Sequence, residues 1–478
     1  MSVLHELEPR EVFRFFEAIC DIPHGSRNTK ALSDYCMVFA RIRNLRCEQD
    51  KANNVIIWKG GTPGYEDHPP VILQGHLDMV CEKEKDVKID FKEDGLTLTV
   101  EDGYVKANGT TLGADNGIAV AMALALLDSR SIPHPPLEVV LTTDEEIGMI
   151  GANALDVSPL KAKTMINLDS EDEGVLTVSC AGGVKASLLL PLKKEKKSGV
   201  SLTLELSGLS GGHSGVDILG DHVNAIHYSH TLYTALAPFA TDLRIADWQG
   251  GGMDNAIPRQ ATLRVLAIGG MDAGYAEAIK GAMDALRQHE PDAVLTIKTE
   301  ENATLWVLNA DSNQKALRLI SESPNGVQSM SEDIKGLVQT SLNLGILTIS
   351  REEMKAVYAI RSSVDKERFA LAKTLETLIK SLGGKYRETG SYPAWEYRHN
   401  SPIRELATTT FRRLFGGECR IEAIHAGLEC GVFAGKIKDL DCLSMGPDLF
   451  DVHTPRERLS ITSVQRTWLY LTEILKAL

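Results

Sequence analysis

Three short, almost wholly apolar runs constrain the fold of this chain more than any other feature. They span residues 69–75, 137–143 and 164–168, and each is followed directly by a histidine or an acidic residue. Apolar runs of this length are typical of strands that are buried on both faces of a sheet. Residues 116–128, between the first two runs, are apolar nearly all round, which predicts a packed helix.

Helical and strand signals alternate through the first part of the chain. Residues 9–20 and 29–45 carry apolar side chains at helical spacing, and residues 54–59 form a further strand-like run. This alternation predicts an α/β fold, with a layered catalytic domain built on a mostly parallel central sheet.

After a lysine-rich stretch at residues 192–199, the alternation of helix and buried strand gives way to an α+β pattern. The segments after it follow the order β-α-β-β-α-β, and a second, similar set follows that one. We therefore expect an inserted α+β domain at 186–390, made of two ferredoxin-like (split βαβ) units. The α/β character then returns, so residues 1–185 and 391–478 are predicted to form one domain.

Composition excludes several kinds of protein. The 478 residues are 43% apolar and 24% charged, which is typical of a globular protein with an ample core. The formal charge of −14 disfavours nucleic acid or an anionic membrane as a partner. We find neither a membrane-spanning run nor a signal-peptide pattern, and the eight cysteines contain no CxxC pair. These features predict reduced thiols and a cytoplasmic location.

Five residues at predicted strand ends and turns are candidate metal ligands. They comprise two imidazoles and three carboxylates: His76, Asp115, Glu146, Asp169 and His453. Two adjacent divalent metals need such a set if one carboxylate bridges them, and the resulting site could activate water at neutral pH. His453 lies far along the chain from the other four. A shared site therefore requires the last 90 or so residues to fold back onto the first domain.

Neighbouring residues suggest how such a site could work. Asp78 lies two positions after His76 and could accept a hydrogen bond from the imidazole, which would fix its tautomer. Glu145 and Glu146 are adjacent and point in different directions, so one could bind metal while the other acts as a general base. Simpler interpretations remain open: Asp115 could be a helix N-cap, and the acidic run could be a solvated loop.

The chain resembles a known family along essentially its full length. The matching segments include VILQGHLDMV, GTTLGADNGIA, DEEIGMIGA, NLDSEDEG, GLSGGHSGVDI, NAIPR and AIHAGLECG. This set resembles the dinuclear zinc metallopeptidases of the aminoacylase/carboxypeptidase superfamily, and in particular the bacterial aminoacyl-histidine (Xaa-His) dipeptidases, also called peptidase D.

The resemblance implies roles for the five ligands and their neighbours. His76 and Asp169 would hold one zinc ion, Glu146 and His453 would hold a second, and Asp115 would bridge the two. Cobalt or manganese are possible substitutes for zinc. Glu145 would be the general base, Asp78 would orient His76, and a cis peptide would join Asp115 to Asn116.

The resemblance also implies that the middle domain is a lid. His213 would stabilise the oxyanion, Asn255 would contact the substrate carbonyl and Arg361 would bind its C-terminal carboxylate. Glu429 could meet the free amino group of the substrate. His213 could instead cap a turn, and Arg361 could form an ordinary ion pair. One departure from the family pattern is the extra negative charge before His453, from two acidic residues: Asp448 and Asp451.

Together these observations predict metal-dependent hydrolysis of unblocked dipeptides with a preference for C-terminal histidine, including carnosine-type substrates. The alternatives are an N-acyl-amino-acid deacylase, a di/tripeptidase of broader specificity and a two-metal phosphoesterase, although no basic cluster for phosphate lies near the ligands. From another class, a non-hydrolytic metal-dependent peptide-binding protein would also fit. The partners we expect are a dipeptide substrate and a second copy of the chain in a homodimer, with no nucleic acid and no membrane.

Overall fold

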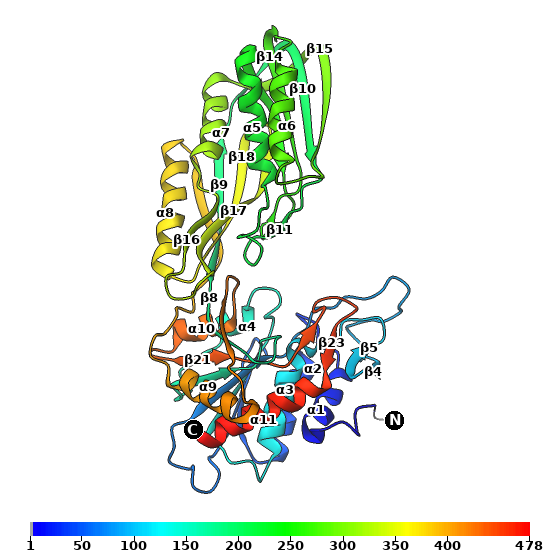
Figure 1. Ribbon diagram of the computed structural model, residues 1–478, viewed down its shortest axis with the longest axis vertical. Coiled ribbons are helices and arrows are strands. Elements are labelled where there is room, and N and C mark those ends of the chain that lie inside the picture. Colours follow the sequence, from blue (N-terminus) through cyan, green and yellow to red (C-terminus); the bar gives the residue numbers. More distant parts are fainter. Residues whose placement is uncertain (1–2) are drawn as a thin grey trace. The chain divides into compact units, whose positions relative to one another are not determined.

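The computed structural model describes residues 3–478, and the chain divides into two compact units (Figure 1). Unit 1 contains the residues up to Cys180 together with Tyr397–Ala423 and Leu428–Leu478. Unit 2 contains Ala181–Glu396 and the short segment Ile424–Gly427. The middle of the sequence is therefore an insertion between two parts of unit 1.

Unit 1 is built on an eight-stranded mixed sheet. Its four central strands, β6, β3, β7 and β21, are parallel, whereas the β1–β2, β2–β6 and β21–β8 pairings are antiparallel. The strand order is β1 (Arg46–Gln49), β2 (Val55–Lys59), β6 (Leu137–Thr142), β3 (Val71–His76), β7 (Thr164–Asn167), β21 (Asp441–Ser444), β8 (Val175–Cys180) and β20 (Arg420–Ile424). The three apolar runs are thus β3, β6 and β7, as predicted, and β3 and β6 are buried at every position.

The helices of unit 1 include α3 (Ala114–Asp128), which packs against α1 (Arg10–Cys20) and β3. Every residue of α3 from Asn116 to Leu127 is buried, because the helix is apolar nearly all round. This confirms the helix predicted at 116–128. The remaining helices are α2 (Lys30–Ile42), α4 (Ile150–Ala154), α9 (Pro402–Phe415), α10 (Glu429–Lys436) and α11 (Ile461–Ala477). Among residues 3–478, no helix is both long enough and apolar enough to cross a membrane.

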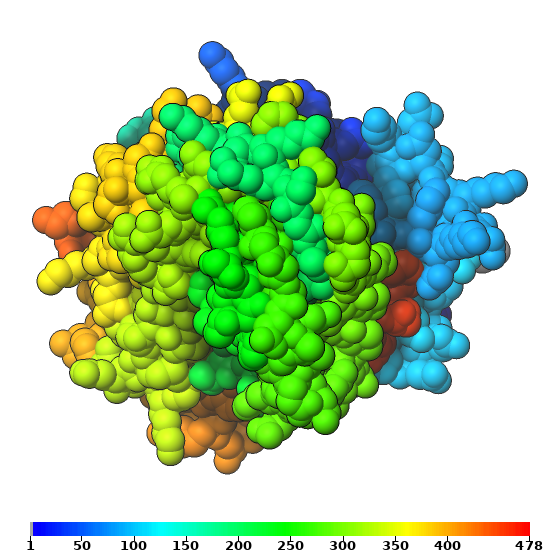
Figure 2. Space-filling view, turned by 90° about the horizontal axis from the view of Figure 1, so that it is seen from above, coloured from blue at the N-terminus to red at the C-terminus, as the bar shows by residue number. Residues whose placement is uncertain are grey.

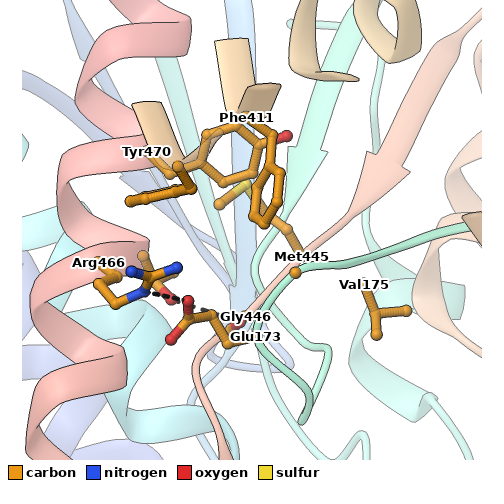
Figure 3. A pocket seen from close by; sticks show the side chains of 10 residues that line it. Glu173, Val175, Phe411, Met445, Gly446, Arg466 and Tyr470 are labelled. Carbon is orange, nitrogen blue, oxygen red and sulfur yellow. Dashed lines mark hydrogen bonds and ion pairs between the residues drawn. The ribbon is translucent and has the colours of Figure 1, made fainter. Parts of the chain in front are cut away.

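The C-terminal part folds back onto the first part of unit 1, as predicted from the position of His453. Strand β21 pairs with β7 in parallel, and α9 packs on α11 through an aromatic cluster (Figure 3). The ring of Phe411 lies 4.9 Å from that of Phe415 and 5.4 Å from that of Tyr470. Arg466 stacks on Phe415 and pairs with Glu173. The cavity beside this cluster has a volume of about 10 Å³, which is room for a single water molecule.

Unit 2 is built on a nine-stranded antiparallel sheet whose two halves join through a short β12–β17 pairing. The first half has the order β15 (Val294–Leu308), β10 (Lys194–Ser207), β14 (Ala261–Met271), β12 (Ala240–Gly250), with α5 (Ala225–Leu236) and α6 (Tyr275–Leu286). The second half has the order β17 (Val338–Ile349), β18 (Glu353–Ser362), β9 (Gly182–Pro191), β19 (Lys385–Tyr392), with β16 (Gly326–Met330) beside β17. Helix α8 (Asp365–Ser381) packs on β9, β18 and β19, and α7 (Ala310–Glu322) contacts α8 and also α5, β12 and β15 of the first half.

The two halves of unit 2 are nested in the sequence. Strand β9 precedes the whole first half in the chain, yet it pairs with β18 and β19 in the second half. The sequence pattern predicts two consecutive sets, whereas the pairing of β9 shows that the second set encloses the first. Figure 2 shows residues of the two halves, green and yellow, beside each other on the surface of unit 2.

Candidate metal centre

Three of the five predicted ligands lie at or just beyond the carboxyl ends of the parallel strands of unit 1, where open α/β sheets bind ligands. His76 is the last residue of β3, Asp169 comes two residues after β7, and Glu146 comes four residues after β6. The register places His76 opposite Thr142 at the end of β6. The sheet therefore brings together residues that are up to 93 positions apart.

One half of the centre contains His76 and Asp169. The imidazole Nε2 of His76 lies 3.2 Å from Oδ1 of Asp115 and 3.4 Å from Oδ1 of Asp169. The side chain of His76 is 2% exposed and that of Asp169 is 7% exposed. Burial alone would lower the pKa of His76, but the carboxylates of Asp169 and Asp115 raise it well above its usual value.

The other half contains Glu146 and His453. Nε2 of His453 lies 3.0 Å from the Glu146 carboxylate and 3.2 Å from Oδ2 of Asp115. The hydrogen bonds to Asp115 and Glu146 raise the pKa of His453 to about 11. His453 is 50% exposed and sits in a loop with a positive φ of 62°.

Asp115 is shared by the two halves, because each of its carboxylate oxygens faces a different imidazole. His76, Asp115 and Glu146 offer ligand atoms that all lie within 4.8 Å of one another. Imidazole nitrogens and carboxylate oxygens suit divalent metals such as zinc. Three carboxylates this close together at a largely buried position also require positive charge to offset their repulsion. The residues therefore fit a metal centre with one bridging carboxylate.

The backbone before Asp115 explains the glycine at position 113. Gly113 adopts a left-handed conformation with φ of 66°, and a Cβ atom there would lie 2.7 Å from Sδ of Met79. The peptide between Asp115 and Asn116 is cis, as the family resemblance implied. Asn116 accepts a hydrogen bond from the backbone N–H of His76 at 3.2 Å and donates one to the carbonyl of Leu168 at 2.8 Å. It thereby links the segments that carry His76 and Asp169.

Asp78 contacts His76 through both its backbone carbonyl and its carboxylate. Nδ1 of His76 lies 2.9 Å from the backbone carbonyl oxygen of Asp78 and 3.6 Å from its carboxylate. The chain bends after β3, so the extended geometry assumed for positions 76 and 78 does not hold. The carboxylate also accepts hydrogen bonds from the backbone N–H groups of Glu145 and Glu146, at 2.9 and 3.3 Å. Ser26, which the sequence did not single out, donates to the same carboxylate at 2.8 Å.

Glu145 and Glu146 have different surroundings, as expected for adjacent residues. Glu146 faces His453, whereas Glu145 follows a turn in which Asp144 has a positive φ of 55°. Burial raises the pKa of Glu145 well above its usual value, and the charges of Asp169, Glu429 and Glu146 act in the same direction. A carboxylate with a raised pKa can both accept and return a proton near neutral pH.

Glu429 lies within the protein rather than on its surface. Its side chain is fully buried, and Oε2 accepts hydrogen bonds from Thr142 Oγ1 at 2.6 Å and from Gln74 Nε2. Gln74 in turn accepts a hydrogen bond from Asn167 at 2.5 Å. This network joins β3, β6 and β7 close to the residues that carry the ligands. Burial raises the pKa of Glu429 to about 7.

The acidic residues before His453 have local partners. Asp448 accepts a hydrogen bond from the backbone N–H of Glu173 at 2.6 Å, and Asp451 forms an ion pair with Arg458. Both charges are therefore used to hold the loop.

In unit 2, His213 and Arg361 lie together. His213 Nε2 is 3.3 Å from Arg361 Nη2, and Arg361 Nη1 donates to the hydroxyl of Tyr392 at 3.0 Å. Arg361 is only 9% exposed, which argues against an ordinary surface ion pair. His213 Nδ1 accepts a hydrogen bond from the backbone N–H of Val216 at 3.2 Å, so His213 does cap its own turn. Burial and the charge of Arg361 lower the pKa of His213.

Two further residues complete this cluster. The carbonyl of Asn255 accepts a hydrogen bond from the backbone N–H of Ser214 at 2.8 Å, which places Asn255 beside the His213 turn. His425, which the sequence did not single out, lies 2.7 Å from Ser341 Oγ, and burial together with Arg361 lowers its pKa to about 4. The only sequence signal for His425 was its position in the matching segment AIHAGLECG.

Residues 72–477 match the protein family described as peptidase family M20/M25/M40. The chain belongs to this family. The Cytosol non-specific dipeptidase of Escherichia coli (strain K12) is 39% identical to it, over 100% of this chain and 99% of that protein. The crystal structure of aminoacylhistidine dipeptidase from Vibrio alginolyticus matches 100% of this chain and 98% of its own, with 34% identity and a TM-score of 0.90.

Less similar solved structures share the fold alone. A Bacillus cereus aminopeptidase structure is 16% identical with a TM-score of 0.55, and the match covers 98% of both chains. The chain is thus an M20/M25/M40 peptidase with a candidate metal-binding group at His76, Asp115 and Glu146.

Proposed function

We propose that this chain is a dimetal dipeptidase that hydrolyses unblocked dipeptides, with a preference for C-terminal histidine that extends to carnosine-type substrates. The single observation that carries this proposal is the sharing of Asp115 between two imidazole–carboxylate pairs. The full-length similarity to proteins named as dipeptidases supports the substrate class. The name of the Escherichia coli relative likewise supports a cytoplasmic location.

The centre is proposed to hold two zinc ions per chain, with cobalt or manganese as substitutes. His76 and Asp169 would hold one ion, Glu146 and His453 would hold the other, and Asp115 would be the ligand that the two ions share. Bound metal would polarise the scissile carbonyl and lower the pKa of a water molecule. The Glu145 carboxylate accepts a proton from the attacking water and delivers it to the leaving amine nitrogen. Asp78 holds the backbone of Glu145 and Glu146 and orients the His76 ring.

Unit 2 is proposed to act as a lid and dimerisation domain made of two split βαβ halves. His213 stabilises the oxyanion, Asn255 contacts the substrate carbonyl and Arg361 binds the C-terminal carboxylate. The low pKa of His213 supports a neutral imidazole, which can donate one hydrogen bond without carrying charge. The hydrogen bond between Arg361 and Tyr392 supports a fixed orientation of the guanidinium group.

A dipeptidase of broader specificity is the second candidate. The observation in its favour is the name of the Escherichia coli relative, which describes that protein as a non-specific dipeptidase. Deacylation of N-acyl amino acids is the third, because it would use the same metal chemistry.

One assay separates these candidates. The zinc-loaded protein is incubated with carnosine, with Ala-His, with Ala-Ala and with N-acetyl-histidine, and Glu145→Gln is the control. We expect release of histidine from carnosine and Ala-His, slower cleavage of Ala-Ala, and none of these reactions in the control. Equal rates for Ala-His and Ala-Ala would favour the broader dipeptidase, and cleavage of N-acetyl-histidine would move the protein to the deacylases. No cleavage of any dipeptide by protein that binds two metals would contradict the proposal.

A further inference from the structure

Glu457 is a buried acidic residue that has no role in the reaction described above. It lies between β22 (Leu449–Phe450) and β23 (Arg458–Ser460), four residues after His453, and it is 3% exposed. Its carboxylate accepts hydrogen bonds from four successive backbone N–H groups. These belong to Leu112 at 2.7 Å, Gly113 at 3.1 Å, Ala114 at 2.9 Å and Asp115 at 3.4 Å.

The position of these four N–H groups connects Glu457 to the metal centre. They belong to the last two residues before α3 and to its first two residues, the second of which is Asp115, shared by both halves of the centre. The first N–H groups of a helix have no partner within the helix, and its N-terminus favours negative charge. A carboxylate that accepts several backbone N–H groups makes strong, charge-assisted hydrogen bonds and fixes the turn geometrically.

The same loop also supplies His453, whose Nε2 lies 3.2 Å from Oδ2 of Asp115. The segment from His453 to Glu457 therefore contacts Asp115 twice, through the side chain of Asp115 at one end and through its backbone at the other. The two contacts together define where the Asp115 carboxylate lies relative to the His453 ring.

We propose that Glu457 is a positioning residue that fixes the bridging ligand Asp115 for both metals. This inference rests on the proposed dimetal function. The C-terminal segment would then contribute twice to the centre: His453 is a direct ligand, and Glu457 supports Asp115, the ligand that both metals share. Outer residues that orient metal ligands typically alter metal affinity by 10- to 100-fold when they are replaced.

A purely structural role is the competing explanation, and the chain offers a matched control for it. Glu138 is also 3% exposed, and its carboxylate accepts hydrogen bonds from the backbone N–H groups of Lys161 at 2.9 Å and Ala162 at 3.0 Å. It lies in β6 near the end opposite the ligands. Glu138→Gln should therefore affect folding in a similar way to Glu457→Gln and leave the zinc affinity unchanged.

The experiment compares Glu457→Gln, Glu138→Gln and the unaltered protein. Glutamine keeps the size of the side chain but replaces one accepting oxygen with an NH₂ group, so part of the turn loses its partner. Zinc affinity is measured by competition with a chelator, and the melting temperature is measured on the metal-free proteins. We expect Glu457→Gln to bind zinc about 10- to 100-fold more weakly and to lower kcat with little change in KM. Glu138→Gln should lower only the melting temperature. Equal zinc affinity in both variants would overturn the proposal.

A second measurement needs no variant and decides the question if Glu457→Gln does not fold. Hydrogen exchange is followed at the backbone N–H groups of residues 112–115 in the unaltered protein, with and without zinc. A turn that Glu457 fixes is protected before zinc is added, whereas protection that appears only with zinc overturns the proposal. Both readouts are independent of peptide hydrolysis. A protein that binds zinc and hydrolyses no dipeptide would therefore contradict the proposed function and still test the role of Glu457.

Discussion

The two halves of the metal centre share Asp115 but rest on different kinds of structure. His76 ends a central strand and Asp169 follows the neighbouring one, and their side chains are 2% and 7% exposed. Glu146 and His453 lie in loops, and His453 is 50% exposed with a positive φ. A sheet buried on both faces fixes the first pair, whereas the second pair depends on loop contacts such as those of Glu457.

This difference implies that the two metals are held unequally. Opening of a loop costs less free energy than opening of a central sheet. We therefore expect the site of Glu146 and His453 to lose its metal first, and the site of His76 and Asp169 to retain it longer.

The largest effect is expected from the residue that belongs to neither half. Glu145→Gln removes the proposed base without removing a ligand, so kcat should fall by about 10² to 10⁴ while both metals remain bound. Steady-state kinetics with metal analysis of the same sample checks this result. Full activity in the variant would remove Glu145 from the mechanism, and loss of metal would make it a ligand.

Ligand substitutions test the contrast itself. His453→Ala should leave about one metal per chain, because the strand-based pair and Asp115 remain. Asp115→Ala should weaken both sites, because both halves share this residue. Metal content after gel filtration, measured by mass spectrometry, distinguishes the two. Two metals per chain in Asp115→Ala would contradict a shared ligand.

Asp78→Asn is expected to have an intermediate effect. The variant weakens the hold on the backbone N–H groups of Glu145 and Glu146, while the carbonyl that orients His76 stays in place. Activity and metal affinity should fall by about 10- to 100-fold, with the loop-based site affected more. Asp50 is a matched control, because its carboxylate also accepts hydrogen bonds from two backbone N–H groups, those of Ala52 and Asn54. These residues are not among the proposed ligands, so Asp50→Asn should keep both metals.

The smallest effect concerns the pH dependence of stability. The pKa of Glu429 is raised to about 7 by burial, from an ordinary 4.5, so the folded protein binds this proton more tightly than the unfolded chain does. Glu429 therefore contributes most to stability below about pH 4.5, and this contribution falls as the pH rises to about 7. In Glu429→Gln, the free energy of unfolding should fall by about 1–3 kcal/mol less over this pH range than in the unaltered protein. Unfolding of the metal-free proteins in urea at pH 5 and pH 8 tests this, and equal slopes with pH would contradict it.

The strand-based half could be predicted from the sequence for a physical reason. The sequence of a strand that is buried on both faces is a short apolar run. A polar residue directly after such a run lies at the ligand-binding edge of the sheet. His76 and Asp169 follow this pattern without help from tertiary contacts. Glu146 shares this signal, because it closes the acidic run that follows the apolar residues 137–143. His453 lies in a loop and is a candidate through its residue type and the family resemblance.

Other features depend on contacts between distant segments, which no local pattern records. Glu457 accepts hydrogen bonds from backbone N–H groups 342 to 345 positions away, and Ser26 donates a hydrogen bond to Asp78, 52 positions away. The nesting of β9 in the second half of unit 2 is also decided by pairing over long separations. The closer approach of the Asp78 carbonyl than of its carboxylate to Nδ1 of His76 follows from a bend after β3 that no local pattern predicts.

The most direct test of the shared centre is anomalous diffraction from crystals of the zinc-loaded protein, recorded on both sides of the zinc absorption edge. We predict two peaks per chain, one contacting His76 and Asp169 and one contacting Glu146 and His453, with one oxygen of Asp115 on each. Titration with a chelator before data collection should remove the second peak first. A single peak, or two peaks without Asp115 between them, would contradict the account.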